Sequence, residues 1–380
     1  MMSGWQTKPL GELCDILDTR RKPITKRDGT AGEYPYYGAT GIQDYVGGFL
    51  FDEPLVLVGE DGAKWASGDQ TAFPVSGKCW VNNHAHVLRP HRSRLTDNWL
   101  IHFLVHSDLS DFVSGLTVPK LNQGNLREIP IPLPPLPEQQ RIVGILDEAF
   151  AGIATAKANA EKNLQNARAL FESHLHAVFT HRGPGWVETK LDDVTDLITC
   201  GVAKRPDYVP NGVPFLSAKN VKNGQVIWSG YQFITEEAHR ALTKHNKPRM
   251  GDILYTRVGS YGEAAIVDRE IEFSVFVSLT LIKPKKSLLN AFLKHYLNSS
   301  MVKELAAASI TGVGVGNLNV GAVREFPIHL PSFEEQESIT ACLVALQTET
   351  RRLEALYAKK LAALDELKSA LLHQAFSGQL

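Results

Sequence analysis

The sequence lacks several features that would assign it to a well-defined class of protein. Its four cysteines lie far apart and none is in a C-x-x-C pair, so neither a disulfide framework nor a zinc knuckle is predicted. It has no run of eighteen apolar residues, and its first residues lack the apolar core of a signal peptide. We therefore expect a cytoplasmic protein that neither spans a membrane nor is secreted.

Common catalytic motifs are also missing. There is no N-P-P-Y or D-P-P-[WYF] methyltransferase motif, no G-x-x-x-x-G-K-[ST] phosphate loop, no H-E-x-x-H and no G-x-S-x-G. His84 and His86 could share one face of a strand and bind a metal, but no third ligand is nearby in sequence, which favours structural hydrogen bonding. We expect no catalytic residue, no cofactor and no metal site in this chain.

The composition that remains is that of a folded protein with more than one domain. Hydrophobic residues make up 43% and charged residues 21% of 380 positions, enough apolar surface for folding and more chain than one core usually organises. The formal net charge is -1, so bulk charge gives no sign of a nucleic-acid partner. Any such partner must be inferred from local basic patches.

An internal repeat is the clearest pattern in the sequence. Residues 115–146 and 312–343, which are 197 positions apart, are identical at 15 of 32 positions. The same spacing continues without a gap through Phe179 and Phe376. Further upstream, Trp5 and Trp186 open similar segments, but the sequences between these anchors diverge. The chain therefore reads as a duplicated domain and helix, with the middle of each domain changed.

A long helix is predicted to follow each proline-rich segment, at 135–182 and 332–380, because about 43 residues there contain no proline and almost no glycine. Apolar residues at spacings of 3 and 4 predict a coiled-coil seam. Only seven positions separate Phe179 from Trp186, so the second helix should run back antiparallel to the first. The predicted seam comprises Ile142, Leu146, Ile153, Leu170, Ile339, Leu343, Leu353, Leu364 and Leu371.

Between these helices, the segments 1–134 and 183–331 are predicted to be two similar domains of α+β class. Short β-rich segments after Pro54 and Asp252 alternate with glycine-rich turns, and one helix is expected near Trp99 and another near Phe292.

Basic and turn residues recur at matching points of the two domains, which favours nucleic-acid binding over two sets of solvated loops. Basic side chains neutralise phosphates, while arginine, lysine, asparagine and threonine at turns can reach base edges. The candidate DNA-binding residues are Arg20, Arg21, Lys22, Lys26, Tyr37, Thr40, Lys64, Lys120, Lys204, Arg205, Ser217, Lys219, Asn220, Arg257 and Tyr261.

Taken together, these residues resemble the DNA specificity (S) subunits, or HsdS family, of type I restriction-modification systems. The resemblance covers essentially the whole chain and is carried by [IF]-P-[IL]-x-L-P-x-x-x-E-Q before each long helix, YYGATGI, VLVGEDGA, WVNNHAHVLRP and DILYTRVGSYG. It implies two target recognition domains, each reading half of a bipartite asymmetric sequence in double-stranded DNA, with an antiparallel coiled coil setting their spacing.

The resemblance also implies that this subunit is non-catalytic. Two methyltransferase (M) subunits would bring S-adenosylmethionine, and restriction (R) subunits would bring ATP and Mg²⁺. Two alternatives remain at this stage. The chain could be a coiled-coil scaffold with two protein-binding heads and no DNA role, or the recognition module of a nuclease whose catalytic half is separate.

Overall fold

The computed structural model describes residues 5–24, 31–115, 117–259, 261–311 and 316–380. The chain forms two compact units, one of residues 1–161 with 358–380 and the other of residues 162–357. Each unit contains one α+β domain and portions of two 45-residue helices, α3 (Leu136–Thr180) and α8 (Phe333–Ser377). No helix in the described ranges is long and apolar enough to cross a membrane.

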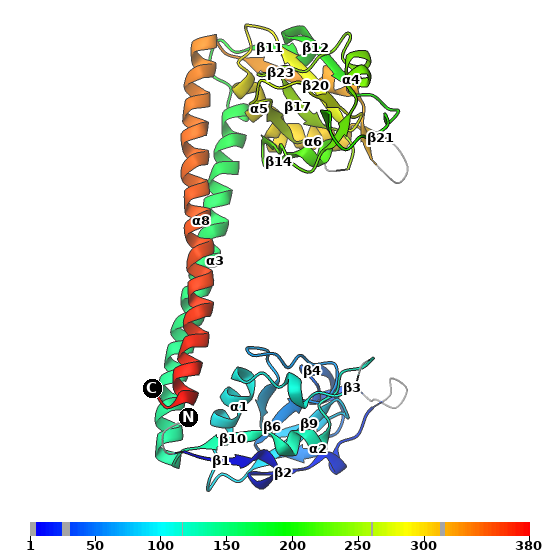
Figure 1. The fold of residues 1–380 in the computed structure, drawn as a ribbon. Coiled ribbons are helices and arrows are strands. Elements are labelled where there is room, and N and C mark those ends of the chain that lie inside the picture. The colour runs from blue at the N-terminus through cyan, green and yellow to red at the C-terminus, as the bar shows by residue number, and fades with distance from the viewer. Residues whose placement is uncertain (1–4, 25–30, 116, 260, 312–315) are drawn as a thin grey trace. The chain divides into compact units, whose positions relative to one another are not determined.

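The first domain contains two four-stranded sheets and a short ribbon (Figure 1). The central sheet is antiparallel and has the order β2 (Cys14–Ile16), β9 (Ala85–Pro90), β6 (Leu55–Gly59) and β7 (Ala72–Val75). The second sheet has the order β4 (Gly41–Val46), β3 (Ala31–Gly38), β8 (Lys78–Val81) and β5 (Phe51–Asp52), with β3 and β8 parallel. The ribbon pairs β1 (Gln6–Pro9) with β10 (Pro130–Leu133).

Five short helices complete the described part of the first domain. They are η1 (Leu10–Glu12), η2 (Asp18–Arg20), α1 (Asp97–His106), η3 (Ser110–Phe112) and α2 (Gln123–Glu128). Among them, α1 begins at a capping residue, Thr96, whose side chain accepts a hydrogen bond from the Trp99 amide.

The second domain repeats the central sheet. Its strands β12 (Thr195–Cys200), β20 (Leu279–Pro284), β17 (Ile253–Thr256) and β18 (Ala264–Ile266) have the same antiparallel order as β2, β9, β6 and β7. A parallel pair also recurs, in the sheet of β16 (Gln232–Ile234), β13 (Val213–Leu216) and β19 (Ser274–Val275). The described residues of this domain also form three two-stranded sheets. These pair β11 (Val187–Lys190) with β23 (Pro327–Leu330), β14 (Val221–Lys222) with β15 (Gln225–Val226) and β21 (Ile310–Thr311) with β22 (Asn317–Leu318).

The second domain carries more helix than the first. Its helices are η4 (Leu191–Val194), η5 (Ala218–Asn220), α4 (Glu236–Leu242), α5 (Asn290–Asn298), α6 (Ser300–Ala308) and α7 (Val320–Arg324). By sequence and position, α5 corresponds to α1, whereas α4 has no counterpart among the described first-domain helices.

Each central sheet is buried on both faces, which explains the continuous apolar character of its middle strand. In β6, Val56 and Val58 join the core that includes the long helices, while Leu55 and Leu57 point to the core shared with the second sheet. This is the two-residue alternation of a strand. The strand β17 divides in the same way, and all its residues are buried.

One glutamine at the start of each long helix ties that helix to its domain. Gln139 accepts a hydrogen bond from the Thr96 amide at 2.9 Å and donates to the carbonyls of Arg94 and Pro134 at 2.8 and 2.9 Å. Gln336, its repeat equivalent, makes the corresponding three bonds to Leu289, Ser287 and Pro331 at 2.8, 3.1 and 3.2 Å. These bonds fix the direction in which each helix leaves its domain.

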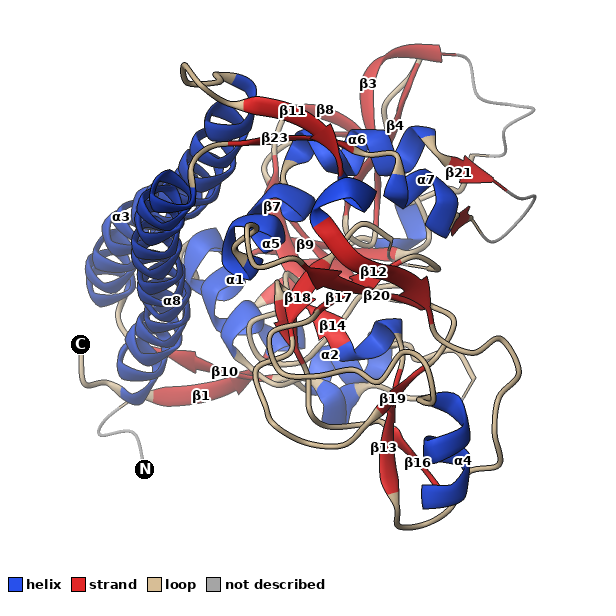
Figure 2. Ribbon diagram, turned by 90° about the horizontal axis from the view of Figure 1, so that it is seen from above, coloured by secondary structure: helices blue, strands red, loops and turns tan. Residues whose placement is uncertain are grey.

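The two long helices run side by side and antiparallel within each unit (Figures 1 and 2). In the first unit, Arg141 contacts the Leu380 carbonyl while Lys157 contacts Asp365. In the second, Arg168 contacts Glu354 while His174 lies 3.8 Å from Cys342. As residue numbers increase along α3, the residue numbers of their partners on α8 decrease, which confirms the antiparallel coiled coil. The predicted duplication of an α+β domain is also confirmed.

Candidate nucleic-acid interface

The first basic cluster lies on and after η2, between β2 and β3. The Arg20 guanidinium lies 4.6 Å from the centre of the Phe51 ring and remains half exposed. Lys22 is exposed, and its carbonyl accepts a hydrogen bond from Trp80 Nε1 at 2.8 Å. Both cationic side chains therefore project from a backbone that the domain holds in place. The candidate Lys26 lies outside the described residues.

Arg21 has a different environment from its two neighbours. Its side chain is only 13% exposed and forms ion pairs with Glu60 and, at 3.4 Å, with Asp18. Lys120 Nζ lies 2.8 Å from the other Glu60 oxygen, and His86 Nδ1 lies 2.6 Å from Asp18. Two of the candidate DNA-binding residues, Arg21 and Lys120, are thus parts of one ionic network, which is buried at Arg21 and reaches solvent at Lys120, whose side chain is 43% exposed.

Opposite charges compensate one another within this network. Burial by itself raises the pKa of Asp18, but the hydrogen bond and charge of His86, together with Arg21, lower that pKa below its ordinary value. Ligand atoms of Asp18, Glu60 and His86 lie within 4.8 Å of one another, a spacing that a metal ion could use. Arg21 already pairs with both carboxylates, so we interpret the cluster as structural.

The aromatic turn predicted to contact DNA is the β3–β4 hairpin. Tyr37 is half-buried with its ring 6.0 Å from Phe73, and burial raises the pKa of its phenol. Thr40 is exposed at the tip of the hairpin, and Lys64 is exposed on the turn after β6. Of these three candidates, Thr40 and Lys64 can contact a ligand without rearrangement.

The second basic cluster lies between β12 and β13, at the position that corresponds to the first. Lys204 and Arg205 are both exposed, and the Arg205 guanidinium lies 5.1 Å from the centre of the Phe276 ring. The arginine in each cluster thus lies over a phenylalanine ring of its own domain. Lys219 is exposed on η5 nearby in sequence.

Two other candidates on this segment are engaged internally. Ser217 and Asn220 form a capping box at the two ends of η5. The buried Asn220 amide also donates to the carbonyls of Ile227 and Ser229, both at 3.1 Å. These bonds use the polar groups that a base contact would need.

Arg257 is 7% exposed, on the turn that follows β17. Its guanidinium donates to the Leu318 carbonyl at 2.9 Å and to the Val277 carbonyl at 3.2 Å. Tyr261, four residues further on, is well exposed. The two candidates on this turn therefore separate into one side chain that supports the turn and one that is accessible.

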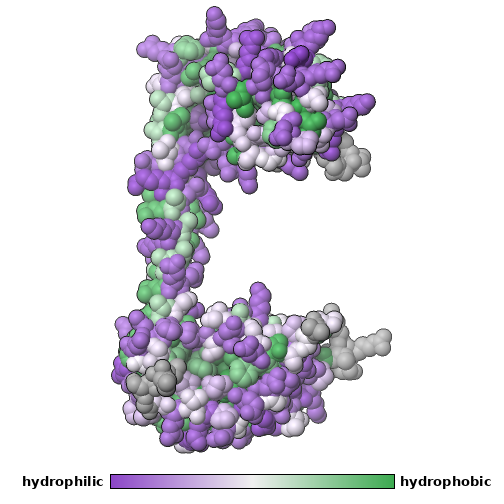
Figure 3. Space-filling view, viewed as in Figure 1, coloured by the Kyte–Doolittle hydropathy of each residue, from purple (hydrophilic) through white to green (hydrophobic). Residues whose placement is uncertain are grey.

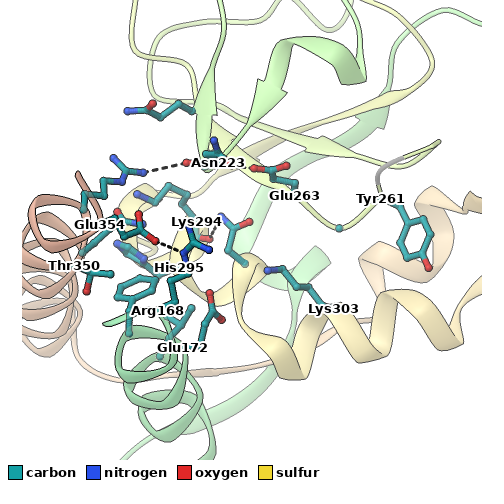
Figure 4. Close-up of a pocket in the computed structure, with 18 residues that line it drawn as sticks. Arg168, Glu172, Asn223, Tyr261, Glu263, Lys294, His295, Lys303, Thr350 and Glu354 are labelled. Carbon is teal, nitrogen blue, oxygen red and sulfur yellow. Dashed lines mark hydrogen bonds and ion pairs between the residues drawn. The ribbon is translucent and has the colours of Figure 1, made fainter. Parts of the chain in front are cut away.

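A cavity of about 770 Å³ lies beside Tyr261 in the second domain. It is lined by α3, α5, α6, α8, the β14–β15 hairpin and the turn at Gly262, and Figure 4 shows Lys303 extending toward the helices that carry Arg168 and Glu354. Sequence reasoning missed this cavity. The available signal was in the repeat, where Gln347 replaces Phe150 and Arg351 replaces Ala154.

The residues of the predicted seam are buried or partly buried in the long helices, except one. Ile142, Leu146, Ile153 and Leu343 are buried, and Ile339, Leu353, Leu364 and Leu371 are partly buried. Leu170, however, is 60% exposed. The stripe of buried and partly buried residues continues from Ala160 through Leu164, Ala167 and Phe171, because the step after Ala167 is four residues rather than three.

Two ion pairs join the long helices, and the repeat relates them. Lys157 Nζ lies 2.5 Å from Asp365, and Arg168 Nε lies 2.7 Å from Glu354. Lys157 is equivalent to Glu354 in the repeat, and Arg168 to Asp365. Both cations belong to α3 and both anions to α8, which favours pairing of α3 with α8 over pairing of either helix with a copy of itself.

Comparisons with known proteins agree with this duplicated architecture. The family model described as the type I restriction modification DNA specificity domain matches residues 2–165 and, a second time, residues 184–361. A Haemophilus influenzae protein assigned provisionally as a type I restriction enzyme specificity subunit is 28% identical over 91% of this chain and 88% of its own length. The EcoBI specificity subunit of Escherichia coli is 26% identical, over 70% of this chain and 62% of that subunit.

Solved structures show the same fold. A chain from a study of assembly and conformational transition in the type I R-M system aligns with a TM-score of 0.77 at 21% identity, over 100% of this chain and 99% of that one. The HsdS subunit of Thermoanaerobacter tengcongensis aligns with a TM-score of 0.63 at 22% identity, over 100% and 98% of the two chains.

Proposed function

From the premise that this chain belongs to the type I restriction-modification DNA specificity family, we propose that it is the non-catalytic subunit that selects the DNA sequence. Each domain reads one half of a bipartite target in double-stranded DNA. Because the two domains share a frame but differ in their middle segments, the two half-sites differ and the target is asymmetric.

The observation that carries this proposal is an exposed basic loop at the same point of both domains. Arg20 and Lys22 lie between β2 and β3, and Lys204 and Arg205 lie between β12 and β13. With one cationic loop in each domain, the chain can neutralise backbone phosphates at each of the two half-sites. Exposed turn residues supply the base-edge contacts. The residues retained for direct contact are Arg20, Lys22, Thr40, Lys64, Lys204, Arg205, Lys219 and Tyr261.

The remaining candidates have a supporting role in this proposal. Arg21, Lys120, Asn220 and Arg257 make internal ion pairs or hydrogen bonds that hold the contact loops. Ser217 caps η5 and Tyr37 packs inside its domain. Their replacement should therefore act first on stability and only through it on DNA binding.

The coiled coil sets the spacing of the half-sites and docks two methyltransferase subunits. Apolar residues are interspersed with hydrophilic ones on the visible face of the long helices (Figure 3). Leu170 and Leu367 are both exposed and occupy equivalent positions of the repeat. Two copies of one partner require two equivalent surfaces, and these leucines provide them.

The remaining chemistry belongs to the partners and takes place in the cytoplasm. The methyltransferase subunits bring S-adenosylmethionine, and restriction subunits bring ATP and Mg²⁺. The isolated chain should therefore transfer no methyl group to DNA until the methyltransferase subunit is added. Methyl transfer by this chain alone would contradict the proposal.

The test of DNA contact is the assembled methyltransferase carrying Arg20→Ala, Lys22→Ala, Lys204→Ala and Arg205→Ala. We expect weaker DNA binding and a salt dependence that flattens by up to about 0.9 in log-log slope for each phosphate that the variant no longer neutralises. The control is Lys8→Ala with Lys190→Ala, which removes exposed positive charge from β1 and β11. Equal salt slopes in both variants and the parent would contradict a role for these loops in DNA binding.

A further inference from the structure

The cavity of the second domain contains an excess of positive charge. Four cations line it, Arg168, Lys294, Lys303 and Arg351, against three carboxylates. Glu354 is paired with Arg168, and Glu263 accepts a hydrogen bond from the Gly224 amide at 2.9 Å. The third carboxylate, Glu172, is exposed at the margin.

Three of the four cations have no ion-pair partner among the residues that the structure describes, and two of the three are lysines. These are Lys294 on α5 and Lys303 on α6. Burial lowers the pKa of Lys294, and the charge of Arg351 lowers it further. Within the described part of the chain, Arg351 donates one hydrogen bond, to the Asn223 carbonyl at 3.1 Å. Like charges brought together in a partly desolvated cavity favour an anion between them.

A buried histidine adds an unused hydrogen-bonding atom to this cavity. His295 is 2% exposed, lines the cavity, and its Nε2 has no hydrogen-bond partner in the described part of the chain. Buried polar atoms normally have a partner, so this nitrogen indicates a missing ligand atom. In its neutral form the ring can donate a hydrogen bond from Nε2 to an anionic oxygen. Figure 4 shows His295 between Lys294 and the helix that carries Arg168.

In the corresponding corner of the first domain an aromatic ring lies beside the histidine, and the histidine has a carboxylate partner. Phe150 occupies the position of Gln347, with its ring centre 5.5 Å from His102 and 5.2 Å from Lys368 Nζ. His102, which corresponds to His295, has Nε2 2.9 Å from Asp147. The shared frame of the two domains therefore does not by itself create a cavity. The second domain has replaced an aromatic plug by polar and cationic residues.

We propose that this cavity binds a phosphate group, held by Lys294, Lys303 and Arg351 with His295 Nε2 as a hydrogen-bond donor. Its volume is in the range of small-molecule sites, about 300 to 1,000 Å³. The phosphate comes either from the DNA backbone or from a free phosphate-bearing molecule. The DNA source rests on the proposed function, whereas the free source does not.

The variant Gln347→Phe tests the site by restoring the plug of the first domain. A second variant, Lys294→Ala with Lys303→Ala, removes two of the three unpaired cations without filling the cavity. Lys244→Ala, an exposed lysine after α4, is the control for loss of one charge in the same domain. Circular dichroism and thermal unfolding of each full-length variant establish that it folds.

The first arm titrates the full-length chain with inorganic phosphate, without DNA, and follows the ³¹P resonance. A free-ligand site predicts saturable binding that both test variants weaken at least tenfold and Lys244→Ala does not change. The second arm measures the salt dependence of DNA binding by the assembled methyltransferase. A DNA source predicts that both test variants flatten the log-log slope by about one phosphate contact, close to 0.9.

Either arm alone supports the site and identifies its source. If the parent shows no saturable phosphate binding, and folded test variants have the DNA affinity and salt slope of the parent, the proposal is overturned. A failure of the proposed function is separately visible, because the parent methyltransferase would then show no sequence-selective DNA binding in the second arm while the first arm could still succeed.

Discussion

In the two domains, equivalent main-chain carbonyls are hydrogen-bonded by different side chains. In the first domain, His86 Nε2 lies 2.7 Å from the Leu121 carbonyl. In the second, the equivalent Leu318 carbonyl accepts its bond from Arg257. The residue that follows the middle strand also differs: it is Glu60 after β6 in the first domain and Arg257 after β17 in the second. Each of these two residues accepts a main-chain bond from the equivalent leucine, at 2.8 and 2.9 Å.

This difference teaches that a duplicated backbone can be preserved while its buried polar chemistry is exchanged. The first domain uses a network of opposite charges around Glu60, and the second uses one guanidinium bonded to two carbonyls. The anchors that join each domain to its helix, Gln139 and Gln336, stay the same. We infer that the frame constrains the anchors and leaves the domain middles free to change specificity.

The largest effect is expected from removing the central cation of the first-domain network. Arg21→Met leaves Asp18 and Glu60 buried without that cation, which should lower the free energy of unfolding of the first domain by about 4 kcal/mol. Arg20→Met, at the exposed neighbour, should cost less than about 1 kcal/mol. Urea unfolding of the full-length chain measures both. If both variants lose a similarly small free energy of unfolding, Arg21 is not a buried structural cation but behaves like the exposed Arg20.

The anchors provide a second test, because they should respond alike. Gln139→Leu and Gln336→Leu each leave one amide and two carbonyls without a side-chain partner. Each should lower the unfolding free energy of its own domain by about 3 kcal/mol. Gln140→Leu, at the exposed neighbouring position, is the matched control. A large loss at one anchor and none at the other would break the equivalence of the two helix junctions.

The buried His295 should make the stability of the second domain depend on pH. Burial and the charge of Lys294 lower the pKa of His295 from 6.5 to about 3. Between these values the unfolded chain binds a proton that the folded domain does not, so stability falls as the pH falls. From pH 7 to pH 5 the second domain should lose about 2 kcal/mol.

Replacing the histidines identifies the source of that loss. His295→Phe should remove it from the second-domain urea transition, whereas His102→Phe should leave that transition unchanged. A pH dependence that persists in His295→Phe would assign the loss to other groups.

The long helices were predictable because their signals are local. The repeat was predictable because its two copies align without a gap. Prolines before Leu136 and Phe333 delimit the helices, and spacings of 3 and 4 mark the seam. Leu170 was misplaced because a seam alternates between these two spacings, and only packing decides which one applies. Leu164 and Phe171 lie on the actual stripe.

For the candidate DNA-binding site, the sequence predicts which loops are involved but not which side chains on them are exposed. Arg205 and Arg257 look alike in sequence, since each follows a β-rich segment near glycine. Their exposure differs because the Leu318 carbonyl, sixty-one positions from Arg257, lies beside one and not the other. Long-range pairing of this kind is invisible to local pattern. The cavity around His295 was missed for the same reason, because its walls come from six separate segments.

The central claim is that two different domains read two half-sites at a spacing set by the coiled coil. One matched heptad inserted after Ala160 and after Tyr357 falls between the two interhelical ion pairs and keeps the seam in phase. It lengthens each helix by about 10.5 Å, close to three base pairs at about 3.4 Å each. Affinity should fall, because three base pairs also rotate one half-site about the DNA axis and the DNA must twist.

The decisive measurement is selection of methylated sites by this variant, assembled with its methyltransferase subunits, from a DNA library in which the gap between half-sites is randomised. The account predicts that the preferred gap grows, by up to about three base pairs, while both half-sites stay the same. Activity on the original gap alone would show that the coiled coil does not set the spacing and would contradict the account.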